Sequence, residues 1–206
     1  ITAQPTGFTN SYTEDDTTGV NISDTDTTIT DGDSTTMSKA VITISNYVSG
    51  DTFSWTNSGG VTGSYDGAGK LTLTGSASMA TYESVIESVK YKTTSNDPTD
   101  GGANTQRAIN VVVYDELSFA SNTAVSKIAI TALNDAPSGA DTTITFAEDT
   151  PLTLKSSDFG FSDTLDGKSA NTLAAVKIAT LPGAGAFKNN GVTVTAGQVV
   201  SVADIT

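Results

Sequence analysis

Two landmarks recur in the same order within the chain, and this internal repeat restricts its fold more than any other feature. Ile1-Thr2-Ala3 with Pro5 matches Ile130-Thr131-Ala132 with Pro137, and Tyr12 to Asp15 matches Phe146 to Asp149. The prolines at 5 and 137 and the glutamates at 14 and 148 are separated by nearly the same interval. Such a repeat is typical of tandem domains. We therefore expect an incoming linker at 1–7, a first repeat at 8–136 and the opening part of a second at 137–206.

Within the first repeat, short β-branched runs alternate with turn residues, which is the pattern of an all-β sandwich. The predicted strands are Ala40–Ile44, Thr52–Trp55, the two arms of a hairpin at 64–74 with Asp66-Gly67 at its tip, Ile109–Val113 and Val125–Ile130. Only one segment has helical spacing: Tyr82, Val85, Ile86 and Val89 predict a short helix near 80–89. The fold class expected is all-β, with tandem immunoglobulin-like sandwiches of which the second is incomplete.

The composition excludes several function classes. The chain has no cysteine and no histidine, which rules out disulfides, zinc–thiolate sites and Ser-His-Asp catalysis. With 10 basic and 23 acidic residues it carries a net charge of −13, which disfavours nucleic acid and anionic membranes as partners. No apolar run reaches the length of a membrane span, about 20 residues. We expect no enzymatic activity, because no shielded carboxylate pair is evident.

The acidic residues gather where strands are predicted to end, in pairs such as Asp24/Asp26 and Asp115/Glu116, and Asp135 stands beside Asn134. Calcium prefers six to eight oxygen ligands, so such clusters are candidate calcium sites. Aspartate and asparagine are also common turn residues, and for any single pair this structural interpretation stays open. Asp31-Gly32-Asp33 is the pair that we interpret as a solvated turn. Neither an EF-hand nor a glycine-rich nonapeptide calcium repeat is present.

Residues 65–137, from Tyr65-Asp66-Gly67 to Asn134-Asp135-Ala136-Pro137, resemble the cadherin-like (immunoglobulin-like β-sandwich) tandem repeats of large bacterial calcium-dependent RTX-type adhesins. The shared features are the hairpin, the short helix, the turn at Asp115 and the terminal Asn-Asp-Ala-Pro. The resemblance implies Ca²⁺ between domains and at their ends. Carried over position by position, it implies as metal ligands Glu14, Asp24, Asp26, Asp115, Asn134, Asp135, Glu148, Asp163 and Asp166. Two departures are the missing Asn-Asp pair in the opening 1–7 segment and the Asp115-Glu116 that replaces Asp-Gly.

Residues 146–205 look like the opening half of another repeat type of the same adhesins, one that in some members is split by an inserted ligand-binding domain. The resemblance implies a secreted, cell-surface protein: a monomeric extender module that presents such a domain, here expected after Thr206, and supports adhesion or biofilm formation. Its expected partners are calcium ions and neighbouring domains of the same polypeptide.

An alternative function is a carbohydrate- or peptide-binding module. Trp55 and Tyr47 are then the candidate stacking residues. The competing interpretation places Trp55 in the core of a sandwich, so the burial of its side chain discriminates between the two.

Overall fold

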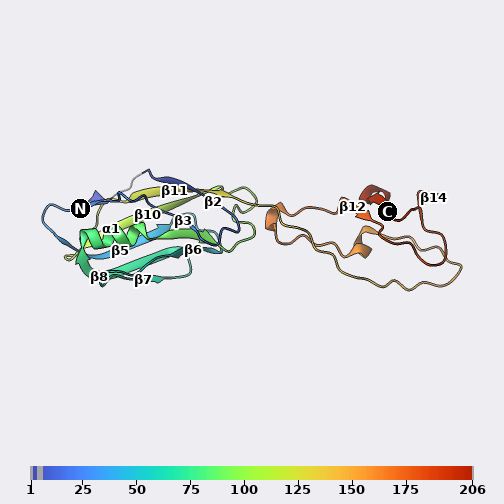
Figure 1. The fold of residues 1–206 in the computed structure, drawn as a ribbon, viewed down its shortest axis with the longest axis horizontal. Helices are drawn as coiled ribbons and strands as arrows, with labels where there is room; N and C mark the ends of the chain where they lie inside the picture. Colours follow the sequence, from blue (N-terminus) through green and yellow to red (C-terminus); the bar gives the residue numbers. More distant parts are fainter. Residues whose placement is uncertain (1, 4–6, 206) are drawn as a thin grey trace. The chain divides into compact units, whose positions relative to one another are not determined.

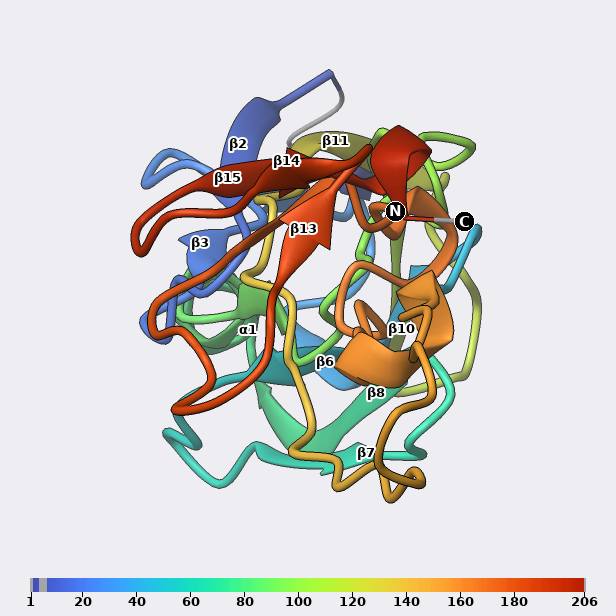
Figure 2. The same ribbon diagram turned by 90° about the vertical axis from the view of Figure 1, so that its right-hand side faces the viewer.

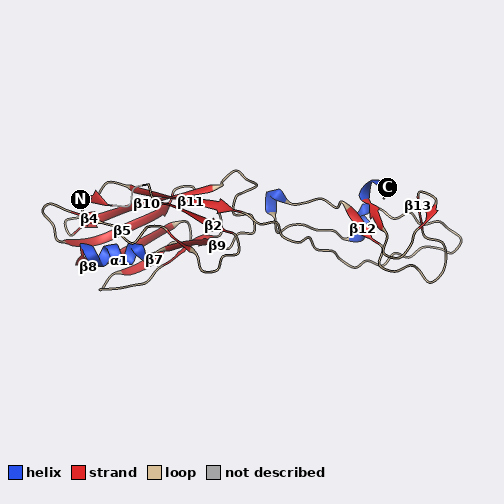
Figure 3. Cartoon of the chain, turned by 45° about the horizontal axis from the view of Figure 1, so that its top comes forward, coloured by secondary structure: helices blue, strands red, loops and turns tan. Residues whose placement is uncertain are grey.

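The computed structural model describes residues 2–3 and 7–205 and divides the chain into two compact units. Unit 1 runs to Asn134 and also contains Gly167–Ser169, and unit 2 comprises Asp135–Asp166 and the residues from Ala170 onward. Strands dominate unit 1, whereas unit 2 consists largely of loops (Figure 3). The fold is all-β with one α-helix, as the sequence predicted.

Unit 1 is built on a six-stranded sheet in which sequence neighbours are mostly not neighbours in space. Its strand order is β2 (Thr9–Thr13), β11 (Ala124–Thr131), β10 (Gln106–Asp115), β5 (Thr36–Ile44), β8 (Lys70–Ser78) and β7 (Thr62–Tyr65). All pairs are antiparallel except β11 with β2, which is parallel. The edge strands β2 and β7 are at the top and the bottom of Figure 2 (labels as in Figure 1).

A second, three-stranded sheet contains β3 (Val20–Asn21), β9 (Lys90–Thr93) and β6 (Asp51–Ser54), paired antiparallel in that order. A short antiparallel pair joins β1 (Thr2–Ala3) to β4 (Ile29–Thr30). Of the predicted linker at 1–7, residues 1 and 4–6 lie outside the described residues.

The two sheets share one hydrophobic core because alternate residues of each strand point inward. Leu71 and Leu73, predicted to face inward, are fully buried in β8, and β10 contributes Ile109, Val111 and Val113. Edge-to-face aromatic contacts join the sheets: Tyr12 with Tyr91 at 5.4 Å between centroids, and Phe53 with Tyr65 at 6.0 Å. Each buried aliphatic side chain contributes about 1.5–3 kcal/mol.

The predicted helix is present as α1 (Met79–Glu87), beginning at an N-cap, Ser78, whose side chain accepts a hydrogen bond from the Thr81 amide. It buries Tyr82, Val85 and Ile86, the residues whose spacing predicted it. The Tyr82 hydroxyl donates to the Gly75 carbonyl at 2.7 Å, and burial raises the pKa of Tyr82 to about 12.

A buried ion pair crosses from one sheet to the other. Arg107 of β10 and Asp51 of β6 are both almost inaccessible, and the Arg107 Nε lies 2.5 Å from the Asp51 Oδ2. The Tyr91 hydroxyl donates to Asp51 at 2.6 Å, and burial raises the pKa of Tyr91. The guanidinium also donates to the carbonyls of Pro98 and Asn104. Its charge is therefore paired, and its remaining donors are used to hold the chain between β9 and β10.

Unit 2 has no extended sheet. It contains two separate antiparallel pairs, β12 (Ala175–Lys177) with β15 (Val199–Ser201) and β13 (Lys188–Asn189) with β14 (Val192–Thr193), and the 3-10 turns η1 (Ser156–Phe159) and η3 (Val202–Asp204). Among its described residues only Val194 and Val200 are buried hydrophobics. Its apolar residues therefore lack the partners that a closed sandwich would supply.

Candidate metal sites

The residues predicted as metal ligands lie at strand ends and in loops of both units. Unit 1 holds Glu14 after β2, Asp24 and Asp26 between β3 and β4, Asp115 at the end of β10 and Asn134 after β11, and unit 2 holds Asp135, Glu148, Asp163 and Asp166. Within the described residues, no group of three or more acidic side chains is close enough to hold a metal ion by itself. Any site here must therefore draw on other oxygen atoms as well.

In unit 2, two buried carboxylates converge on one loop. Asp163 and Asp166 are 8% and 3% exposed. Asn171 links them, because its backbone amide donates to the Asp163 Oδ2 at 2.6 Å and its side-chain amide lies 3.5 Å from the Asp166 Oδ2. The Asp135 amide donates to the Asp166 Oδ1 at 2.9 Å. Three of the predicted residues thus lie in one constellation.

Within this constellation, the Asp163 carboxylate is only partly satisfied. The Asp163 Oδ1 is buried and has no hydrogen-bond partner. The salt bridges in the described part of the chain involve neither Asp163 nor Asp166. Burying a carboxylate without a counter-charge is costly, so this arrangement favours a bound cation. Carboxylate oxygens are among the ligand atoms that Ca²⁺ prefers.

In unit 1, Asp24 and Asp26 form a close pair. A hydrogen bond shared with the Asp26 carboxyl raises the pKa of Asp24, and the Asp24 Oδ1 is shielded from solvent with no partner. Two carboxyls that share a proton repel each other once both are ionised. The pair is therefore a place where a cation would replace the shared proton.

Asp115 lies beside acidic residues that the sequence analysis did not include among the ligands. It is buried, and its Oδ1 accepts a hydrogen bond from the Phe119 amide at 2.8 Å. The pKa of Asp33 is raised, mainly by a hydrogen bond with Asp31, and the charge of Asp115 adds to this rise. Gly32 and Asp33 are exposed, so the interpretation of this pair as a solvated turn remains open. Only the pairing of β5 with β10 brings them near Asp115, so local sequence carried no signal of it.

Glu116 stabilises the same end of unit 1. Its carboxylate accepts hydrogen bonds from the hydroxyls of Ser34 and Thr36, and these lower its pKa, the Ser34 bond most. Glu116 stands where the resemblance predicts a glycine. In the same turn, Ser118 has the left-handed backbone conformation (φ 70°).

The other predicted ligands have different surroundings. Glu14 is buried, and its Oε2 accepts a hydrogen bond from the Leu133 amide at 2.7 Å, which ties the end of β2 to the chain after β11. Asn134 is exposed at that same point of unit 1, and Glu148 is exposed in a turn of unit 2. The structure does not place Glu148 beside the Asp163 constellation.

Trp55 and Tyr47, the aromatic residues considered for ligand stacking, pack against the hydrophobic core of unit 1. Trp55 is half-buried, and a side chain added at Gly63 of β7 would collide with its indole ring. Its Nε1 donates to the Asn57 Oδ1 at 2.9 Å. Tyr47 also packs against the core, and its hydroxyl donates to the Gly67 carbonyl. Both residues therefore have structural partners.

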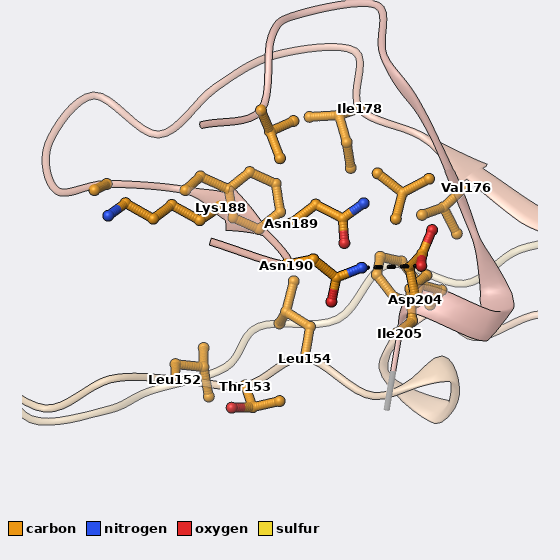
Figure 4. A pocket seen from close by; sticks show the side chains of 15 residues that line it. Leu152, Thr153, Leu154, Val176, Ile178, Lys188, Asn189, Asn190, Asp204 and Ile205 are labelled. Carbon is orange, nitrogen blue, oxygen red and sulfur yellow. Dashed lines mark hydrogen bonds between the residues drawn. The ribbon is translucent and has the colours of Figure 1, made fainter. Parts of the chain in front are cut away.

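A cavity of about 330 Å³ opens in unit 2 (Figure 4). Its walls mix apolar side chains, among them Leu152, Leu154 and Val176, with polar ones such as Lys188, Asn189 and Asp204. The polar contact drawn there is a hydrogen bond of 3.0 Å from the Asn190 side-chain amide to the Asp204 Oδ1.

Comparison of the chain with protein-family models, with curated proteins and with solved structures finds no match. None of the helices in the described part of the chain has the length and apolar character needed to cross a membrane.

Proposed function

We propose that this chain is a calcium-binding structural extender of a large bacterial surface adhesin, built from tandem cadherin-like sandwiches. Calcium at the ends of its domains stiffens them. The adhesin is displayed on the outside of the cell, and this module holds a ligand-binding domain away from the cell surface. The observation that carries the proposal is the Asp163 Oδ1, a buried carboxylate oxygen without a hydrogen-bond partner beside buried Asp166.

The donor set fits calcium better than other common metals. Asp163 and Asp166 offer hard oxygen atoms, and the chain contains no cysteine or histidine for softer metals. Two carboxylates give charge balance for one divalent ion, and backbone carbonyls and water would complete its shell of six to eight ligands. Bound calcium would supply the counter-charge that the buried carboxylates lack.

Thermal unfolding with and without calcium tests the proposal. We expect calcium to raise the melting temperature, since a ligand at a hundred times its dissociation constant stabilises the folded state by about 2.7 kcal/mol. Asp163→Asn combined with Asp166→Asn should remove most of this response. The matched control is Asp141→Asn with Asp149→Asn, two exposed residues of the same unit with the same change in charge.

Identical melting curves in chelator and in millimolar calcium would reject the proposal for the whole chain. An equal calcium response in the Asp163/Asp166 variant and its control would reject this particular site.

The cavity of unit 2 and the two-stranded pair beside it favour a second candidate function, the uptake of an extended peptide segment. β12 and β15 form a pair with no further strand beside it, and Val176 of β12 faces the cavity. A strand with alternating apolar residues could both pair with an open edge and fill the space. A synthetic peptide of alternating valine and threonine should shift the amide resonances of β12 and β15. Unchanged spectra at millimolar peptide would exclude this candidate.

A further inference from the structure

We propose that Gly167-Lys168-Ser169 is a latch that docks into the loop 94–105 of unit 1 and is held there by a hydrogen bond and an ion pair. These three residues form the 3-10 turn η2 and belong to unit 1, although the chain on either side of them belongs to unit 2. The latch goes beyond the proposed calcium function, because its contacts are made by side chains and backbone alone.

Two aspartates of the loop hold the latch. The Lys168 amide donates to the Asp97 Oδ2 at 3.0 Å, and the Lys168 Nζ lies 2.6 Å from the Asp100 Oδ1. The Asp97 Oδ1 accepts a bond from the Gly101 amide at 2.8 Å, so the same carboxylate orders the loop and receives the latch. The hydrogen bond to Asp100 also raises the pKa of Lys168.

The fit between the latch and the loop is close on both sides. A Cβ at Gly167 would lie 2.8 Å from the Asp97 Cβ, and a Cβ at Gly101 would lie 2.8 Å from the Lys168 Cβ. Both glycines also have positive φ, 51° and 68°, a conformation that other residues rarely adopt. Glycine therefore stands at the two positions where a side chain would prevent docking.

Contacts with the core of unit 1 order the loop 94–105 before the latch docks. Arg107, fixed by its ion pair with Asp51, donates to the carbonyls of Pro98 and Asn104 on opposite sides of the loop. Within the loop, the buried Thr99 accepts a bond from the Gly102 amide through its hydroxyl and from the Asn104 amide through its carbonyl. The loop thus presents Asp97 and Asp100 on a rigid support, which reduces the entropy lost when the latch docks.

Trypsin provides a direct test, because Lys168 is itself a cleavage site. A docked lysine with its amide bonded to Asp97 cannot enter the protease, so cleavage after Lys168 reports the open latch when opening is fast. Asp100→Asn keeps the side-chain shape, and asparagine tolerates the positive φ of 52° at this position. We expect it to raise cleavage after Lys168 about two- to fivefold, as loss of an exposed ion pair predicts. Adding Asp97→Ala should raise it further.

The controls separate the latch from general loosening and from calcium. Cleavage after the exposed Lys177 of unit 2 should stay unchanged, and Asp141→Asn should leave both sites as in the native chain. The same differences should appear in chelator and in calcium, so the latch can stand even if calcium leaves the melting temperature unaltered. Equal cleavage after Lys168 in all variants would overturn the latch, as would a parallel rise after Lys177.

Discussion

At the scale of single residues, Arg107 shows how one side chain connects the core to a surface loop. Its guanidinium is buried, pairs with Asp51 and binds two carbonyls of the loop 94–105. Such a pair adds little net stability over an apolar replacement, but breaking it leaves a buried charge alone. The role of Arg107 is therefore to fix geometry.

Arg107→Ala should lower the free energy of unfolding by about 3–5 kcal/mol, because it strands the Asp51 carboxylate in the core. Urea unfolding followed by far-UV circular dichroism measures this loss. Removing an exposed cation of the same unit, Lys127→Ala, should change stability by no more than about 0.5 kcal/mol. A loss of the same small size for Arg107→Ala would contradict the assigned role.

The Asp24/Asp26 pair predicts a pH dependence in metal-free solution. The pKa of Asp24 is raised in the folded chain, so the folded state binds its proton more tightly than the unfolded state. The contribution of this group to stability therefore decreases as the pH rises through the folded pKa. In Asp26→Asn, an NMR titration should show the pKa of Asp24 shifted back towards its ordinary value. An unchanged titration curve would show that Asp26 is not the cause.

At the scale of elements, the packing of Trp55 on β7 decides how the edge of the six-stranded sheet is covered. The indole ring lies against Gly63, and Asn57 accepts bonds both from the Trp55 Nε1 and from the Gly63 amide. The ring covers the strand backbone where other residues would project a side chain. This covering protects an edge strand that has no further partner in the sheet.

Gly63→Ala should displace the indole and reduce stability by about 1–3 kcal/mol through overpacking. Because Trp55 is the single tryptophan of the chain, its fluorescence should move to longer wavelength as the ring becomes exposed. Gly32→Ala is the control, since a Cβ there meets no atom within 4 Å and the backbone has no positive φ. An unshifted emission maximum in Gly63→Ala would refute this packing role.

At the scale of the whole molecule, the two units differ in how much apolar surface they bury. Nearly all buried hydrophobic residues belong to unit 1, while unit 2 leaves large side chains exposed, among them Phe146, Leu152, Leu165 and Leu181. A domain without a core cannot offset the conformational entropy lost on folding. Unit 2 is therefore expected to be the less stable of the two units.

Hydrogen exchange should separate the units. Amides of β5 and β10 should exchange only through global unfolding, whereas those of β12 to β15 should exchange much faster because local opening suffices. A chain ending at Asn134 should keep a cooperative unfolding transition. Equal protection in both units, measured by mass spectrometry in chelator, would contradict this difference.

Local sequence pattern predicted the all-β class, the main strands of unit 1 and the helix α1. Strand alternation and helical spacing can both be recognised within a few neighbouring residues. Leu71 and Leu73 and the stripe of Tyr82, Val85 and Ile86 are buried as their spacing predicted. Among the candidate ligands, sequence proximity sufficed for the Asp24/Asp26 pair and for Asp163 with Asp166.

Contacts between distant segments were decided only by tertiary structure. The charge of Asp115 acts on Asp33 because β5 and β10 pair, Arg107 reaches Asp51 across two sheets, and Lys168 docks on Asp97 and Asp100. Each depends on register and strand order, which short-range pattern does not encode. The sequence by itself determined which residues alternate, turn and carry charge. Only the folded chain decided which of those charges meet, because burial and backbone pairing are properties of the whole core.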